Sequence, residues 1–355
     1  MTKALVLRTT IIVAAAATAL LVLVAPAVVV LASAIDGTDS DDNIIGTRDD
    51  DTIMAGNGND TVAGGAGSDE LYAGRGNDNV YGGTGDDRIF GWYGNDTLYG
   101  DSGNDYIITT GEVRRDYQND EKRVYGGSGS DTIEVEKARA IIHGGPHHDS
   151  ITLQGEDGGP GQDSLVYGDA GHDVIVVGDA ANAAAHGGPG NDTISVTGDT
   201  SYTLYGDTGD DILRSNVDLR ASMYGGPGND AFHVSAGDSN QFGGAGNDML
   251  GGSSNTEMTG GPGADIFICA TEPTNEDIIF DYNPSEGDAI QNQEGCDEII
   301  TVGGSQDATP SNATAIEPEH EVDDSSTAAV TDELAANDTT ANATDAENMT
   351  NNVLQ

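Results

Sequence analysis

A nine-residue repeat dominates the chain from Gly37 to Ile108 and limits the folds that this segment can adopt. The segment divides without gaps into GTDSDDNII, GTRDDDTIM, AGNGNDTVA, GGAGSDELY, AGRGNDNVY, GGTGDDRIF, GWYGNDTLY and GDSGNDYII. The sixth position is always Asp, and Ile, Val or Leu always follows two residues later. A helix repeats near 3.6 residues and a strand at two, so this period indicates a compound unit. A fixed short period is typical of stacked coils, in which each unit contacts only its neighbours.

Each nonad combines the features of a tight turn and of a very short strand. Its first six residues are rich in glycine, which permits backbone conformations with φ > 0 and close approach of the next coil. Asn and Asp dominate the fifth position, where we expect a left-handed conformation. The last three residues alternate polar, apolar and polar, as in a strand with one buried face. The predicted fold class is therefore all-β, a solenoid of parallel strands around a thin aliphatic core.

The same signature continues after Ile108 at wider spacing. Asp followed two places later by an aliphatic residue or Phe recurs at Asp131, Asp149, Asp163, Asp173, Asp192, Asp211, Asp230, Asp248 and Asp265. From Asp173 onwards the gaps are 19, 19, 19, 18 and 17 residues, which is close to two nonads. One coil should therefore contain two strands and two turns, with only one turn per coil keeping the signature in this second block. About twelve coils are expected, separated by the interstrand spacing of ~4.8 Å.

The aspartates predict bound divalent cations. Residues 18 apart become neighbours in such a stack, which creates two columns: Asp42, Asp60, Asp78 and Asp96 in one, and Asp51, Asp69, Asp87 and Asp105 in the other. Carboxylates in register repel each other unless cations lie between them. Carboxylate oxygens and turn carbonyls are hard donors on a flexible frame, and they suit Ca²⁺ better than Mg²⁺. The net charge of −48 also opposes a compact state without cations and argues against nucleic acid as a partner.

The repeat resembles the RTX, or haemolysin-type, calcium-binding repeat, whose pattern is G-G-x-G-x-D-x-(apolar)-x. The resemblance covers residues 37–108 continuously and 125–268 with interruptions. It implies a right-handed parallel β-roll that binds several Ca²⁺ ions between consecutive turns. The implied carboxylate ligands are the seventeen aspartates of the two blocks. The implied carbonyl ligands lie in the glycine turns, which include Gly56, Gly58, Gly65, Gly67, Gly74, Gly76, Gly83, Gly85, Gly94 and Gly103.

The end of the repeat block resembles the cap that closes secreted RTX proteins such as the serralysin proteases. The matching residues are Asp265, Phe267, Asp277, Ile279, Asp281, Tyr282, Asp288 and Ile290. Cys269 and Cys296 flank this segment, and the sequence leaves open whether they form a disulfide or stay a free pair.

The two ends of the chain have different compositions from the repeats. Residues 1–34 place Lys3 and Arg8 before an apolar run and end in Ala-Ser-Ala, which predicts a signal peptide, with an uncleaved membrane anchor as the alternative. Either one would export the rest of the chain, in contrast to the C-terminal secretion signal usual in RTX toxins and proteases. Residues 303–355 lack Lys, Arg and aromatic residues, so we expect a disordered acidic tail. Its four N-x-T triplets permit glycosylation but also follow from composition.

The predicted organisation is a signal peptide or anchor (1–34), a contiguous β-roll (35–108), an insertion (109–124), an interrupted β-roll (125–268), a cap (269–302) and the tail (303–355). The insertion contains Arg114, Arg115, Lys122 and Arg123. We expect it to form a solvated hairpin, with a partner-binding patch as the alternative. His143, His147 and His148 have a zinc-like spacing, but they fall at or beside turn positions of the repeat.

These features together predict a secreted, monomeric, non-enzymatic protein whose folding is coupled to Ca²⁺ binding. A secreted enzyme that bears an RTX module is one alternative, although the chain contains neither HExxH nor GxSxG. GDSGND at residues 100–105 follows the phase of the repeat, so we do not interpret it as a protease motif. A calcium-dependent adhesin or surface-structural protein, with an unknown partner at the cell surface, is the other alternative.

Overall fold

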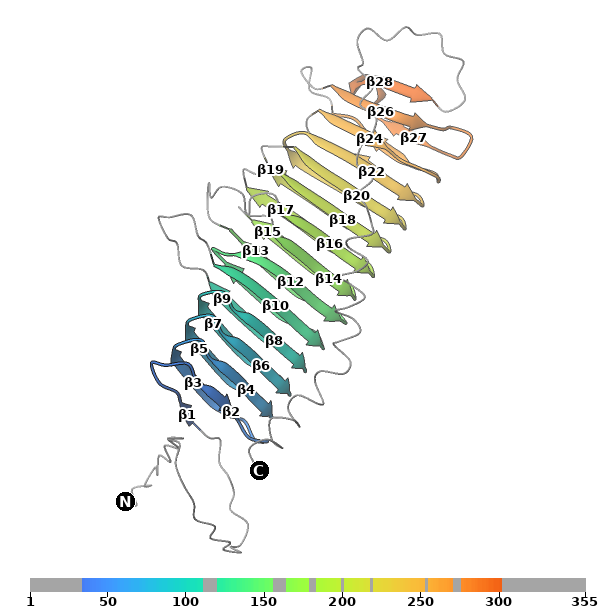
Figure 1. Cartoon of the computed structure of the whole chain (residues 1–355). Helices are drawn as coiled ribbons and strands as arrows, with labels where there is room; N and C mark the ends of the chain where they lie inside the picture. Colours follow the sequence, from blue (N-terminus) through green and yellow to red (C-terminus); the bar gives the residue numbers. More distant parts are fainter. Residues whose placement is uncertain are drawn as a thin grey trace, which may run out of the picture. The chain divides into compact units, whose positions relative to one another are not determined.

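The chain forms a solenoid of parallel β-strands. The computed structural model describes residues 34–110, 120–155, 164–178, 183–198, 201–217, 220–252, 255–270 and 276–301. Odd-numbered strands form one fourteen-stranded sheet, here sheet A, and even-numbered strands form a second, sheet B. Figure 1 shows the strands stacked in chain order, from β1 and β2 at one end to β27 and β28 at the other. The predicted all-β fold of stacked two-strand coils is confirmed.

The strands are short and regularly spaced. Sheet A contains β1 (Ala34–Asp36), β3 (Thr52–Asn57), β5 (Glu70–Arg75), β7 (Arg88–Tyr93), β9 (Tyr106–Thr110), β11 (Thr132–Glu136), β13 (Ser150–Gln154), β15 (Val174–Gly178), β17 (Thr193–Gly198), β19 (Ile212–Val217), β21 (Ala231–Ala236), β23 (Met249–Gly251), β25 (Ile266–Ile268) and β27 (Ala289–Gln291). Sheet B contains β2 (Asn43–Ile45), β4 (Thr61–Ala66), β6 (Asn79–Thr84), β8 (Thr97–Ser102), β10 (Glu121–Ser128), β12 (Arg139–Pro146), β14 (Leu165–Ala170), β16 (Ala184–Pro189), β18 (Tyr202–Thr208), β20 (Ala221–Pro227), β22 (Ser239–Ala245), β24 (Thr256–Thr259), β26 (Asp277–Tyr282) and β28 (Cys296–Thr301). A single 3₁₀ turn, Gln293–Gly295, precedes β28, and no helix in the described ranges is long and apolar enough to cross a membrane.

The core is a narrow ladder of aliphatic side chains between the two sheets. The apolar residue two places after each signature Asp except Asp163 points inward. Successive coils align these residues, as in the pairing of Ile53 with Leu71 and of Leu71 with Ile89. All three are fully buried. The period-two alternation of each short strand therefore places its polar residues on the outer faces and confirms the predicted core.

The turns depend on glycine at the second and fourth positions of the nonad. The ten glycines that the sequence singled out there have φ between 108° and 144°, a region that residues with a Cβ rarely adopt. The fifth position does not take the left-handed conformation that we expected. Its side chain instead accepts a hydrogen bond from the backbone of the next coil, as when Asn77 N donates to Asn59 Oδ1 at 2.8 Å. Further along, His148 Nδ1 accepts from His172 N at 2.7 Å in the same way.

A column of stacked aromatic rings, here called the ring column, covers part of the outer face of sheet B. It consists of Tyr81, Tyr99, Tyr125, His143, Tyr167, His186, Tyr205, Tyr224 and Phe242. Neighbouring ring centroids are 4.3–5.4 Å apart and the planes lie within 18° of parallel. In the strand register, Ala63 precedes the first ring and Thr259 follows the last. This column was not predicted from the sequence, although tyrosine recurs at the ninth position of several nonads.

The C-terminal end of the solenoid continues the same stack. β27 pairs with β25 and β28 with β26. Cys269 and Cys296 form a disulfide with a Cα–Cα distance of 5.3 Å, which resolves the alternative that the sequence left open. The predicted tail and all but the last residue of the predicted signal segment lie outside the described residues.

Candidate metal centre

One unbroken column of aspartates, here called the long column, runs along the edge from which the strands of sheet A begin. It consists of Asp51, Asp69, Asp87, Asp105, Asp131, Asp149, Asp173, Asp192, Asp211, Asp230, Asp248, Asp265 and Asp288. Each residue immediately precedes an odd-numbered strand, and each is at most 8% exposed. The backbone N–H of every member but the last donates to Oδ1 of the next member, at 2.7–3.0 Å. The column predicted from the 18-residue spacing is therefore present and extends through both repeat blocks.

A second column, here called the short column, lies on the edge from which the strands of sheet B begin. It contains Asp42, Asp60, Asp78 and Asp96, joined by the same N–H to Oδ1 bonds at 2.8, 2.8 and 3.1 Å. Beyond Asp96 the register brings Lys122 and then Ala140 to this edge. The loss of carboxylates agrees with the prediction that one turn per coil keeps the signature in the second block.

The long column differs from the sequence prediction at Asp163 and Asp288. Asp163 lies outside the described residues, and the long column passes directly from Asp149 to Asp173, whose Oδ1 accepts the Asp149 N–H at 2.7 Å. Asp163 is therefore not a member between them. Asp288, matched in sequence only to the cap, is the last member of the long column. The Asp-x-apolar signature of Asp288 and Ile290 could have identified it.

The second carboxylate oxygen, Oδ2, has no hydrogen-bond partner at thirteen of these aspartates, within the part of the chain that the structure describes. They are Asp60, Asp69, Asp78, Asp87, Asp105, Asp131, Asp149, Asp173, Asp192, Asp211, Asp230, Asp248 and Asp265. Burying an unpaired charged oxygen costs several kcal/mol or more. Each column thus presents a line of buried oxygens that requires either protons or cations.

The carboxyl groups respond to this environment with raised pKa values. Burial raises the pKa of Asp105 and of Asp149 to about 8, and that of Asp78 to about 7, from the ordinary value of 3.8. The backbone N–H that each carboxylate accepts lowers its pKa, and the neighbouring aspartates raise it again. The dominant cause is desolvation, which disfavours the charged form. At neutral pH these groups are ionised only in part unless a cation neutralises them.

Glycine at the first position of the turn makes room for eleven of the thirteen long-column carboxylates. A Cβ there would lie 2.2–2.6 Å from Oδ2 of the Asp five residues later, at Gly64, Gly82, Gly100, Gly126, Gly144, Gly168, Gly187, Gly206, Gly225, Gly243 and Gly260. In the first ten of these it would also lie 2.3–2.8 Å from the carbonyl oxygen of the equivalent glycine in the next coil. A carboxylate oxygen and a backbone carbonyl oxygen therefore border the same small space. Hard oxygen donors of this kind are those that Ca²⁺ prefers, so the residues present fit this ion.

These first-position glycines are site residues that were not predicted from the sequence, where only glycines of the second and fourth turn positions were named as ligands. We expect Gly187→Ala to lower the thermal stability by roughly 1–3 kcal/mol, the usual range for overpacking. The added Cβ would lie 2.4 Å from Asp192 Oδ2 and 2.8 Å from Gly206 O. Differential scanning calorimetry in excess calcium measures the effect. Gly178→Ala is the control, since its Cβ would meet only Thr197 Oγ1 at 3.3 Å. Equal losses in the two variants would contradict the steric argument.

The comparison with protein families agrees with this geometry. A family model described as the RTX calcium-binding nonapeptide repeat (4 copies) matches residues 36–71, 72–107, 125–165 and 224–256. No curated protein matches the chain. Among solved structures, the chain is similar to the crystal structure of a hyperactive, Ca²⁺-dependent, β-helical antifreeze protein from an Antarctic bacterium. That similarity has 19% identity and a TM-score of 0.47, and covers 78% of this chain and 96% of the other. The chain is a parallel β-solenoid, and four of its segments match the RTX calcium-binding nonapeptide repeat.

Proposed function

We propose that this chain is an exported, non-enzymatic protein whose solenoid folds when several Ca²⁺ ions bind along its two aspartate columns. The observation that carries the proposal is the line of buried Oδ2 atoms without hydrogen-bond partners. Oδ1 of each of these carboxylates is held by an N–H of the preceding coil, so Oδ2 remains available for a cation. Bound Ca²⁺ would neutralise adjacent carboxylates that otherwise repel each other.

The proposed ligands are the aspartates of the long and short columns together with carbonyl oxygens of the glycine turns. Asp288 is added to the set that the sequence implied. Asp163 is not included, since the long column passes from Asp149 to Asp173 without it. Extracellular calcium modules bind with dissociation constants of about 10⁻⁴–10⁻³ M. Ion binding at these sites would contribute directly to folding, so the chain would stay unfolded at low cytosolic calcium and order outside.

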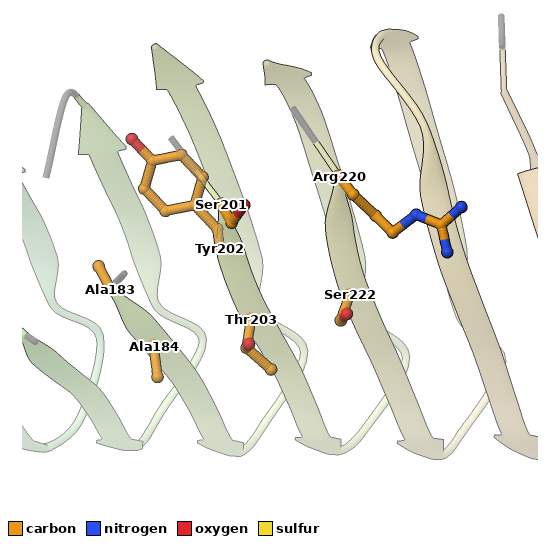
Figure 2. Close-up of a pocket in the computed structure, with 7 residues that line it drawn as sticks. All are labelled: Ala183, Ala184, Ser201, Tyr202, Thr203, Arg220 and Ser222. Carbon is orange, nitrogen blue, oxygen red and sulfur yellow. The ribbon is translucent and has the colours of Figure 1, made fainter. Parts of the chain in front are cut away.

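The disulfide supports an exported role. The Cys269–Cys296 disulfide is typical of proteins from oxidising compartments. A pocket of about 290 Å³ on the outer side of sheet B is lined by Ala183, Ala184, Ser201, Tyr202, Thr203, Arg220 and Ser222. Figure 2 shows these side chains lying along neighbouring strands. The alternative of an RTX-bearing enzyme is tested by screening the folded chain for hydrolase activity.

A matched pair of substitutions tests the calcium proposal. Asp230→Asn keeps an oxygen that can accept the Asp211 N–H, now at 2.8 Å from Asp230 Oδ1, and removes the negative charge. We expect this variant to bind fewer Ca²⁺ ions and to need about tenfold more calcium to fold, since even changes outside the ligand shell cost ~10–100-fold. Isothermal titration calorimetry and circular dichroism measure the ion count and the folding midpoint.

The control is Asp238→Asn, eight residues later, which removes the same charge from an aspartate outside both columns. Asp238 Oδ1 accepts only a side-chain hydrogen bond from Asn255 Nδ2 at 3.1 Å. We expect the control to keep the ion count and the midpoint of the native chain. If Asp230→Asn also leaves both unchanged, the assignment of the long column as the calcium site is wrong.

A further inference from the structure

Lys122 is a fully buried cation at the end of the short column. It lies in β10, immediately before Arg123, which pairs with Thr97 in β8. Asp96 immediately precedes Thr97, so Lys122 occupies the position that an aspartate would take in the next coil. Both side chains are 0% exposed, and Lys122 Nζ is 2.7 Å from Asp96 Oδ2. The interpretation of residues 109–124 as a solvated hairpin is therefore wrong for Lys122, because strand β10 already includes it.

The ammonium group contacts the kinds of oxygen that the column offers to a metal ion. Besides the Asp96 carboxylate, Nζ donates to the backbone carbonyl of Trp92 at 2.6 Å. Trp92 occupies the second turn position, with φ of 62°. In the same column the Oδ2 atoms of Asp60 and Asp78 have no partner in the described structure, whereas Oδ2 of Asp96 is bound by the lysine. One coil further on, the register position holds Ala140, which offers no side-chain oxygen.

We propose that Lys122 is an internal cation that takes the place of a metal ion at the end of the short column. The inference rests on the proposed calcium function of the columns. It adds that metal binding along the edge of the short column ends at Asp96. Lys122 neutralises Asp96 and confines metal binding along this edge to the coils from Asp42 to Asp96. The next coils then carry their ions on the long column alone. An ordinary structural ion pair would leave the number of bound ions independent of residue 122.

The ion count of Lys122→Asp tests this inference. The substitution continues the column with a fifth carboxylate beside Asp96, so the calcium-saturated variant is expected to bind one more Ca²⁺ ion than the native chain. Equilibrium dialysis followed by elemental analysis measures the count. Arg123→Asp is the matched control, because Arg123 lies next in the chain, points outward and is 49% exposed. Its ion count is expected to equal that of the native chain.

A second variant covers the case in which Lys122→Asp does not fold. Lys122→Ala empties the cation position and keeps the Asp96 and Trp92 oxygens. Its Tm at millimolar calcium is expected to fall by roughly 10 °C, the consequence of leaving one partner of a buried ion pair. That Tm should then rise more steeply with calcium concentration than the native Tm, because one more ion is linked to folding. The double variant Asp96→Asn/Lys122→Ala should recover most of the lost Tm, because no buried charge is then left without its partner, and should lose the steeper calcium dependence of Lys122→Ala.

The outcomes separate this inference from the calcium proposal itself. A native chain that binds no Ca²⁺ would overturn the proposed function. A native chain that binds several ions, with neither the ion count nor the calcium dependence of Tm altered by the Lys122 variants, would overturn only the role of Lys122.

Discussion

Chelation of calcium is expected to unfold the solenoid, with loss of most of its β-sheet circular dichroism at neutral pH. A site held at one hundred times its dissociation constant stabilises the folded state by about 2.7 kcal/mol. Four such sites would contribute about 11 kcal/mol, which is comparable with the total stability of ~5–15 kcal/mol typical of folded domains. Without calcium, the charge on the buried Oδ2 atoms is not neutralised, which further destabilises the folded state. We therefore expect a cooperative return of the β signal on titration of the chelated chain with millimolar Ca²⁺.

Magnesium is the control for this experiment. It prefers near-octahedral sites and gives up its water reluctantly, so equal concentrations of Mg²⁺ should restore little β-sheet signal. Keeping the Cys269–Cys296 disulfide intact throughout isolates the effect of the ion. A circular dichroism spectrum that is unchanged after exhaustive dialysis against EDTA would contradict the coupling of folding to calcium.

Acidification of the calcium-free chain is expected to restore part of the β-sheet structure between about pH 8 and pH 5. Burial raises the pKa of column aspartates from 3.8 to about 6 at Asp69 and to about 8 at Asp105. Between the unfolded and folded pKa values the native state binds more protons than the unfolded state. The free energy of unfolding therefore falls as pH rises through this window. Circular dichroism of the chelated chain at a series of pH values measures the effect.

The same protons should compete with calcium. The apparent calcium affinity of the folded chain is therefore expected to fall as pH falls from 8 to 5, because column carboxylates must lose protons to bind the ion. Asp238→Asn serves again as the control and should show the native pH profile. A calcium-free chain that is better ordered at pH 8 than at pH 5 would show that the raised pKa values have no influence on folding.

The sequence predicted the two aspartate columns and the aliphatic core because both follow from a fixed period. Once each coil holds two nonads, residues 18 apart must be neighbours, as Asp60 and Asp78 are. The same argument extended to the second block, where coil lengths of 17 to 19 residues kept the phase from Asp173 to Asp265. The register is strict because a shift by one residue would turn every core side chain outward.

Features that break the repeat could not be read from its period. Lys122 falls within the segment 109–124 that the sequence assigned to an insertion, and only its distance of two residues from the buried Val124 marks it as a column position. At the fifth turn position, Asn59 was expected to adopt a left-handed backbone. Its side chain proved instead to satisfy an N–H of the next coil. The tendency of Asn to adopt a left-handed backbone was therefore outweighed by a hydrogen bond between coils, which forms only when the coils stack.

The ring column has a consequence for how coils of similar sequence find their correct neighbours. A coil placed one turn away from its correct position would still bring aspartate beside aspartate. The aspartate columns alone therefore do not determine which coils become neighbours. A misplacement that moved Ala63 or Thr259 into the column would, however, separate two stacked rings, because neither residue has an aromatic side chain. The uneven outer face of sheet B thus favours one winding over others that the repeat itself would accept equally well.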